Sequence, residues 1–98
     1  MIRYVLSPAA QADLEDIFDY TCERWSADQA ESYVREIQRA IERIAHSPFI
    51  GRSCDEVRAG YRRCAVGSHT LYYRVDRDEL IDVVRILHKR MDVDRHLD

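Results

Sequence analysis

The chain has 98 residues, of which 46% are hydrophobic and 34% charged, with a formal net charge of −3. This length suits one domain with a single modest core, and the composition excludes a disordered chain. No run of about 18 apolar residues is present, which excludes a membrane-spanning helix, and the stretch before Ser7 is too short for a secretory signal. We therefore expect a single domain over residues 1–98 that stays in the cytoplasm, away from membranes.

Arginine is concentrated in the second half of the chain. Residues 1–57 carry six basic residues against 11 acidic ones, whereas residues 58–98 carry nine basic against seven acidic. Guanidinium groups bind carboxylates and phosphates through paired hydrogen bonds, so the second half is the better candidate for an anionic partner. The bias is too weak to indicate direct nucleic-acid binding.

The three cysteines, Cys22, Cys54 and Cys64, are odd in number and widely spaced. This pattern indicates neither a disulfide framework nor a zinc site. We expect small, buried or half-buried thiols in a reducing compartment.

The first half of the chain reads as one strand and two helices. Ile2 to Leu6 is a short β-rich run, and Ser7 followed by Pro8 is a typical helix start. Apolar residues spaced by three and four then predict a helix whose buried face holds Ala10, Leu14, Ile17, Phe18, Thr21 and Trp25. The acidic residues Asp13, Glu15, Asp16 and Asp19 fall mostly off that face and are expected in solvent.

Ser26 caps a second helix, which must end before Pro48. Its apolar face holds Ala30, Tyr33, Val34, Ile37, Ile41, Ile44 and Ala45. Two helices joined so tightly are antiparallel neighbours.

Three strands follow a loop over residues 49–59. They span residues 61–66, 69–75 and 80–88, and the connections are a Gly67-Ser68 hairpin turn and a turn over residues 76–79. Such short connections make the three strands antiparallel. The predicted fold class is therefore α+β, with the order β-α-α-β-β-β and an antiparallel sheet carrying an αα-hairpin on one face.

The last strand is apolar on both faces. Strict alternation places Ile81, Val83 and Leu87 on one face, and Leu80, Val84 and Ile86 on the other. Such a strand is normally covered on both sides, but the helices cover only one. The short segment 91–98, anchored by Leu97, offers little coverage, so we expect a partner to lie against or beside this strand.

Candidate catalytic groups are few. Arg85, His88 and Arg90, with Tyr73 and His96, could form a basic site for RNA cleavage, but basic residues near a strand end are common. No Gly-rich phosphate loop, Ser-His-Asp arrangement or metal-ligand spacing is present. We therefore expect a binding protein rather than an enzyme, with no metal and no cofactor.

An ordered set of motifs resembles the ParE branch of the RelE/ParE toxin superfamily, over essentially the whole chain. The motifs are Leu6-Ser7-Pro8-Ala9-Ala10, Pro48 with Gly51-Arg52, Gly60-Tyr61-Arg62, Tyr73-Arg74-Val75, Val84-Arg85-Ile86-Leu87-His88 with Arg90 and Asp92, and His96-Leu97. The resemblance implies a toxin of a type II toxin–antitoxin system that inhibits DNA gyrase. It also implies a hetero-oligomer with a ParD-like antitoxin, whose C-terminal segment wraps across the toxin.

The RelE branch instead cleaves messenger RNA on the ribosome, with basic residues and a C-terminal tyrosine. This chain has no tyrosine after Tyr73 and a single lysine, Lys89, which favours the ParE branch. A RelE-type endoribonuclease and an inactive antitoxin-binding homologue remain the alternatives. The residues expected to contact the antitoxin or target are Arg62, Arg63, Arg74, Arg85, His88 and Arg90. Which of Arg62 and Arg63 faces outward depends on strand register, which the sequence leaves open.

Overall fold

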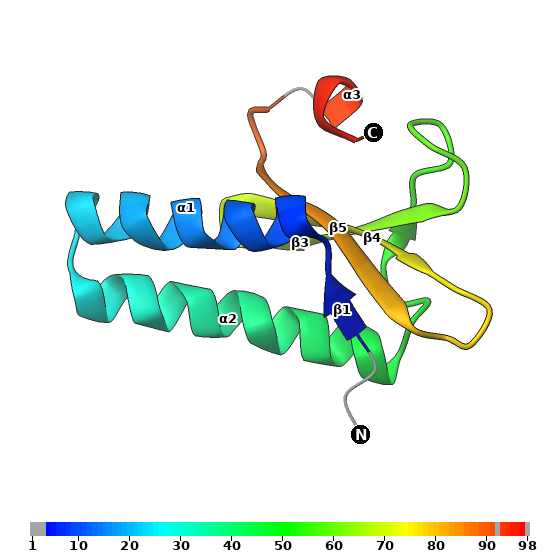
Figure 1. The fold of residues 1–98 in the computed structure, drawn as a ribbon, viewed down its shortest axis with the longest axis horizontal. Coiled ribbons are helices and arrows are strands. Elements are labelled where there is room, and N and C mark those ends of the chain that lie inside the picture. The colour runs from blue at the N-terminus through cyan, green and yellow to red at the C-terminus, as the bar shows by residue number, and fades with distance from the viewer. Residues whose placement is uncertain (1–3, 92, 98) are drawn as a thin grey trace.

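The computed structural model describes residues 4–91 and 93–97. Its elements in chain order are β1 (Tyr4–Leu6), α1 (Pro8–Arg24), α2 (Ala27–His46), β2 (Arg52–Ser53), β3 (Tyr61–Val66), β4 (His69–Val75), β5 (Ile81–His88) and α3 (Val93–His96) (Figure 1). Ile2, the predicted first residue of the opening strand, and Asp92 of the last motif lie outside the described residues. Among the described helices, none combines the length and apolar character needed to cross a membrane.

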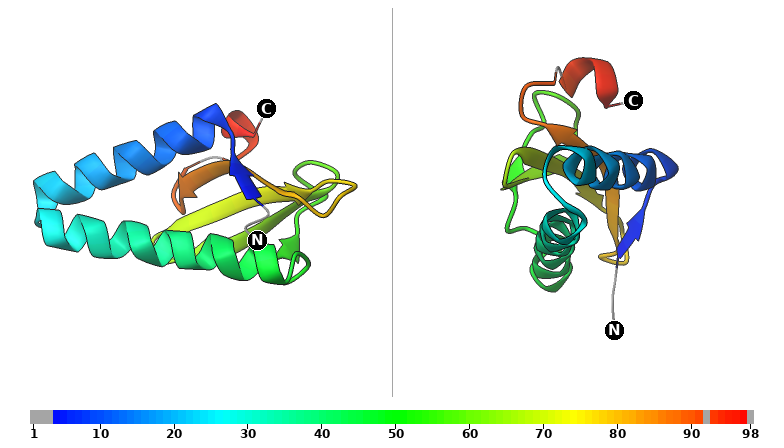
Figure 2. Two further views of the ribbon diagram at one scale, coloured as in Figure 1. Left: turned by 60° about the horizontal axis from the view of Figure 1, so that its bottom comes forward. Right: turned by 90° about the vertical axis from the view of Figure 1, so that its left-hand side faces the viewer.

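Both predicted helix starts are confirmed. Ser7 Oγ accepts a hydrogen bond from Ala10 N at 3.0 Å, and Ser26 Oγ accepts one from Gln29 N at 3.0 Å. Each serine thereby satisfies one of the backbone donors left over in the first helical turn. The two helices then run back to back as a long antiparallel hairpin along one side of the sheet (Figure 2).

The predicted burial of Trp25 is wrong, because its side chain is 73% exposed. Trp25 is the C-cap of α1, with φ −128° and ψ −83°. At this position the backbone has left the helical path, so spacing from the preceding apolar residues no longer sets the direction of the side chain. Of the rest of that face, Ala10, Leu14 and Ile17 are buried, whereas Phe18 and Thr21 are half-buried.

The α+β class is confirmed, and the sheet is mixed rather than wholly antiparallel. Its strand order is β1-β5-β4-β3-β2. β3, β4 and β5 are antiparallel as predicted, but β1 lies parallel to β5, with Tyr4 opposite Ile81 and Leu6 opposite Val83. The segment between these two strands is long enough to return the chain in the parallel sense. β2 pairs with β3 inside the predicted loop 49–59 and is too short to show a period.

The helical hairpin covers one face of the sheet with the larger core. That core includes Leu14, Ile17, Ile37, Ile41 and Ile44 from the helices, and Val66, Leu71, Tyr73, Ile81, Val83 and Ile86 from the strands. Gly67 lets the β3–β4 turn approach this packing: its φ is +56°, and an added Cβ would lie 2.5 Å from the Tyr33 ring. A side chain there would be strained and would also clash.

A β-bulge in β5 changes the faces predicted for its side chains. Tyr72 lies opposite Arg85 but Tyr73 lies opposite Val83, so Val84 is an extra residue in the ladder. The strict alternation that placed Leu87 with Ile81 is therefore wrong beyond the bulge. Ile86 joins the core under the helices, and Leu87 turns to the other face.

The chain itself covers this second face. Cys54, Tyr61, Tyr72, Leu87 and Leu97 form a second core, and Val57, Val84 and Val93 pack against it. Leu97 is fully buried. The expected small coverage by the C-terminal segment is thus wrong, because α3 and the loop after β2 close over the strand together. In Figure 1 α3 lies at the top of the molecule, above the sheet.

Candidate functional site

Arg85, the central arginine of the last motif, is bound within the protein. Its Nε donates to Asp13 Oδ2 at 2.8 Å and its Nη2 donates to Asp13 Oδ1 at 2.7 Å. These hydrogen bonds raise the pKa of Arg85, against the opposing effect of burial. Only 21% of the arginine side chain and 12% of the aspartate side chain are exposed. Arg85 and Asp13 therefore form a bidentate ion pair, which is stronger than a single neutral hydrogen bond. The pair uses Nε and Nη2 of the guanidinium.

Asp13 also caps the open edge of β5. β1 ends at Leu6, opposite Val83, and beyond this point no strand among the described residues pairs with that edge of β5. The backbone amide of Ile86 donates to Asp13 Oδ2 at 2.9 Å, and Ser7 Oγ donates to the carbonyl of Val84 at 2.7 Å. Side chains from the start of α1 therefore replace the missing strand.

The expectation that Asp13 belongs to a solvated acidic face is wrong. It lies three residues after Ala10 and four before Ile17, at the border of the buried face of α1. This spacing was the signal in the sequence that the Asp13 side chain could reach the sheet rather than solvent. Asp16 and Asp19 are exposed as predicted.

Arginines also hold the C-terminal turn in place. Arg85 Nη1 donates to the carbonyl of His96 at 3.1 Å, and Arg58 Nη2 donates to the carbonyl of Leu97. Both contacts reach backbone oxygens, so they fix the path of the chain while Leu97 supplies the apolar anchor.

Register settles the orientation of Arg62 and Arg63, which lie on opposite faces. Arg62 is opposite Tyr73, on the side of the helical hairpin, and its Nη1 donates to the carbonyl of Gly51 at 2.7 Å. Its guanidinium also lies 4.9 Å from the centroid of the Phe49 ring. Arg63 is opposite Tyr72 and faces the side of the second core.

The other predicted contacts lie apart from these arginines. Arg74 forms an exposed pair with Asp82 across β4 and β5, with Nε and Oδ2 3.0 Å apart. Arg90 is exposed in the turn after β5, where its backbone amide donates to His88 Nδ1 at 3.1 Å. The six predicted residues therefore do not form one cluster.

Tyr73 is a structural residue. It is fully buried, its hydroxyl donates to the carbonyl of Pro48 at 2.9 Å, and the same oxygen accepts from Gly51 N at 2.9 Å. Burial raises the pKa of Tyr73. An added Cβ on Gly51 would lie 2.4 Å from this hydroxyl, so the Pro48 to Gly51 turn requires glycine here.

Sequence reasoning missed a cluster of Tyr33, His69 and His88. Tyr33 Oη lies 2.6 Å from His69 Nδ1, and the rings of His69 and His88 meet edge to face at 5.3 Å. Burial and the nearby His88 lower the pKa of His69, with Asp13 acting weakly the other way. Beside the two histidines, Ile17, Tyr20 and Thr21 of α1 line a cavity of about 360 Å³. No spacing in the sequence links these residues, because α2, β4 and β5 meet only in the fold.

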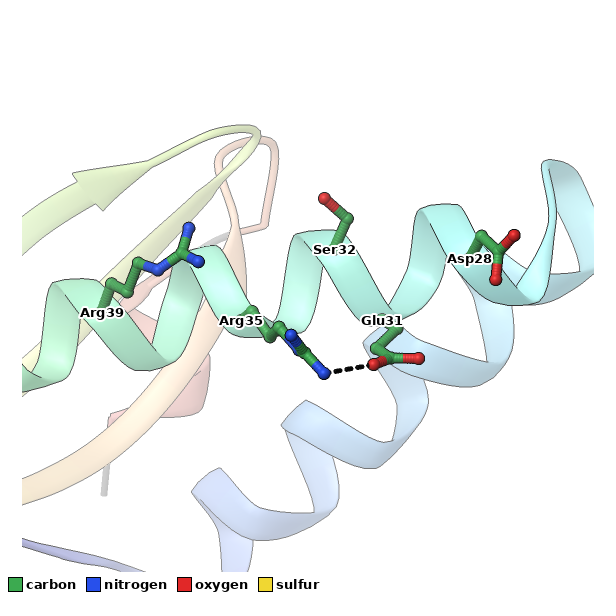
Figure 3. Close-up of a pocket in the computed structure, with 5 residues that line it drawn as sticks. All are labelled: Asp28, Glu31, Ser32, Arg35 and Arg39. Carbon is green, nitrogen blue, oxygen red and sulfur yellow. Dashed lines mark hydrogen bonds and ion pairs between the residues drawn. The ribbon is translucent and has the colours of Figure 1, made fainter.

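The outer face of α2 is a solvated surface. Figure 3 shows Asp28, Glu31, Ser32, Arg35 and Arg39 projecting from this helix, with Arg35 bound to Glu31. Both charged side chains of that pair are more than half exposed, so water screens the pair and it adds little stability. Within residues 4–91 and 93–97, no three His, Cys, Asp or Glu side chains converge to hold a metal ion.

Residues 4–93 match the family described as "ParE toxin of type II toxin-antitoxin system, parDE". The chain belongs to the ParE toxin family. It is 64% identical over 95 residues to "Toxin ParE1" of Mycobacterium tuberculosis strain H37Rv, and the match covers 97% of each chain. It is 47% identical to "Toxin ParE1" of Caulobacter vibrioides, over 99% of each chain.

Proteins of lower identity also match this family member. "Toxin ParE" of Escherichia coli is 31% identical over 95% of this chain and 90% of the relative. A solved structure described as "Chromosomal ParDE TA system from P. aeruginosa" matches with a TM-score of 0.77 at 20% identity, over 90% of this chain and 96% of the other. This last likeness concerns the fold alone, and it agrees with the α+β arrangement.

Proposed function

We propose that this ParE family member is held inactive by a ParD-like antitoxin in a hetero-oligomer, and that it acts on DNA gyrase in the cytoplasm. The family match over residues 4–93 carries the proposal. The full-length similarity to proteins named Toxin ParE1 and Toxin ParE supports it.

The geometry favours a toxin that binds its target over one that cleaves RNA. Of the residues suited to a nuclease site, Arg85 is bound to Asp13 and Tyr73 is fully buried. A general acid or a phosphate-binding group must reach its substrate, which neither residue does in this fold. Arg74 and Arg90 are better placed to meet a partner, because their side chains are exposed, whereas Arg63 and His88 are half-buried as Arg85 is.

Induced expression of the chain alone tests the toxin activity. We expect growth to stop and cells to form filaments, and co-expression of the small gene beside it to restore growth. Soluble expression with normal growth, together with binding to the neighbouring gene product, would identify an inactive antitoxin-binding homologue instead.

Two further measurements test the target. The purified protein should inhibit supercoiling by gyrase in vitro, and adding the antitoxin should restore it. Primer extension on cellular messages after induction should show no new cleavage at codon positions. Cleavage without gyrase inhibition would overturn the gyrase target in favour of the RelE-type ribonuclease.

A further inference from the structure

A cationic groove lies at the β2 edge of the sheet. It has a volume of about 330 Å³, and the side chains that line it include Arg52, Arg63 and Lys89 but no carboxylate. The whole chain carries a net charge of −3, so this groove reverses the average sign of the surface. Clustered like charges with no internal counter-charge favour a ligand of opposite sign.

The groove borders one open position on the edge of β3, at Ala65. β2 pairs with β3 only at Arg52 opposite Arg63 and Ser53 opposite Arg62, and Cys54 N donates to the carbonyl of Tyr61 at 2.9 Å. In an antiparallel ladder every second residue directs its backbone groups to the same neighbour. Tyr61, Arg63 and Ala65 therefore face the β2 side, and among the described residues no strand lies beside Ala65.

These features fit an extended acidic peptide better than a nucleic acid. The backbone of Ala65 offers its amide as a donor and its carbonyl as an acceptor, and the carbonyl takes one long contact from Cys64 Sγ at 3.8 Å. A donor beside an acceptor matches a peptide backbone, whereas phosphate oxygens only accept. An apolar side chain, Ile50, also lines the groove and is 56% exposed. A bound strand with acidic side chains toward Arg52 and Lys89 and an apolar side chain toward Ile50 would match the charge and the apolar surface of the groove. Its backbone would pair with that of Ala65.

We propose that this groove binds an extended, acidic segment of a partner protein, which adds to the sheet as a strand beside Ala65. The inference rests on the proposed function for the identity of that partner, the antitoxin, but the chemistry of the segment follows from the groove itself.

A fluorescein-labelled peptide of alternating glutamate and valine tests the groove on the full chain. We expect saturable binding that the double variant Arg52→Glu/Lys89→Glu weakens at least about tenfold, since two charge contacts are reversed. The control Arg24→Glu/Arg35→Glu makes the same change of net charge on the helical hairpin, at residues that do not line the groove, and should bind as the parent does. Both variants change exposed side chains, so circular dichroism should show that both fold.

Hydrogen exchange gives an independent measurement. The Ala65 amide should exchange quickly in the free protein and slowly with the peptide, whereas the Cys64 amide, which faces β4, should be protected in both states. Absence of binding, equal binding by the groove variant, or unchanged exchange at Ala65 would each overturn the inference. Stronger displacement by a single-stranded oligonucleotide than by unlabelled peptide would assign the groove to nucleic acid and overturn it too.

The product of the neighbouring gene separates this inference from the proposed function. If that protein fails to bind while the peptide binds, the proposed antitoxin is wrong and the groove assignment stands. If it binds the parent and Arg52→Glu/Lys89→Glu with equal affinity, the groove assignment is wrong and the antitoxin stands.

Discussion

One carboxylate, that of Asp13, serves three donors on two neighbouring residues of β5. Its two oxygens accept two bonds from the Arg85 side chain and one from the Ile86 amide. The pair sits where α1, the open edge of β5 and the C-terminal turn meet. Removing the carboxylate leaves a partly buried guanidinium and a strand amide without their acceptor.

We therefore expect Asp13→Ala to lower the free energy of unfolding by about 2–3 kcal/mol, the usual range for losing hydrogen bonds to a charged group. Urea unfolding followed by circular dichroism measures this. Asp19→Ala, on the exposed side of the same helix, should change stability by less than about 0.5 kcal/mol. Equal effects of the two substitutions would show that the Arg85 pair contributes nothing specific.

His69 makes stability depend on pH. Burial, and then His88, lower its pKa below the usual 6.5 in the folded protein. The unfolded chain therefore binds a proton at a higher pH than the folded one does, so stability falls as the pH drops below about 6.5 toward the lowered value. Well above pH 6.5 both states are neutral at this residue and its contribution is constant.

The midpoint of thermal unfolding, measured from pH 7.5 downward, tests this dependence. His69→Asn keeps a polar atom near Tyr33. We expect the midpoint temperature of this variant to fall less steeply just below about pH 6.5 than that of the parent. His46→Asn changes an exposed histidine at the end of α2 and should leave the decline unchanged. A decline of the same slope in all three proteins would place the responsible proton elsewhere.

Residue patterns predicted the caps at Ser7 and Ser26 but not the roles of Asp13 and Tyr73. A cap depends on residues three apart in one segment, so the sequence contains all of its information. The partner of Asp13 is 72 positions away, and the hydroxyl of Tyr73 reaches a turn 25 positions earlier. Such pairings depend on how the sheet is assembled, and composition or spacing does not encode them.

Among the secondary elements, β5 shows where periodicity stops being informative. The alternation of apolar residues predicted its location and its two apolar faces. The bulge at Val84 then reversed the faces assigned to Ile86 and Leu87, because an inserted residue leaves no mark in the apolar pattern. β2 was missed for a related reason, since two residues cannot display a period.

The C-terminal turn, α3, is the element whose role was most underestimated. Leu97 is fully buried over Cys54, which is itself fully buried and whose pKa is raised by burial. A neutral, inaccessible thiol reacts slowly, so opening of this turn should govern its labelling.

We expect Leu97→Ala to destabilise the turn by about 2 kcal/mol or more and to speed labelling of Cys54 by a disulfide reagent correspondingly. The test uses a variant in which Cys22 and Cys64 are replaced by serine, so that Cys54 is the single thiol that the reagent can label. Val5→Ala, at a site 47% exposed on the edge strand, is the control and should leave the rate unchanged. If Leu97→Ala leaves it unchanged as well, the turn does not protect the second core.

Across the whole molecule, one sheet separates two cores of unequal size. Apart from β2, the order of the elements and the α+β class were predictable, because they follow from periodicity and from the lengths of the connections. The distribution of the arginines over both faces was not, although the sequence showed that they gather after residue 57. Their placement depends on register and on the bulge.

The α1–α2 connection projects beyond the end of the sheet in Figure 1, and Trp25 lies at that tip. Trp25→Asp should therefore change the free energy of unfolding by no more than about 0.5 kcal/mol, whereas Leu14→Asp, which places a charge in the larger core, should prevent folding. Urea titration of each variant measures this. Strong destabilisation by Trp25→Asp would show that the tip packs against something.

The extra residue in β5 also bears on chain length. Removing Val84 would leave a regular strand in which Ile81, Val83 and Ile86 still point to the helices, and Arg85 and Leu87 still point away. The deletion would remove the bend of the strand and the Val84 carbonyl, which accepts a hydrogen bond from Ser7 Oγ. A one-residue deletion should thus be better tolerated here than elsewhere in β5. In an alignment of related chains, a gap at this position would mark a straightened strand and not a different core.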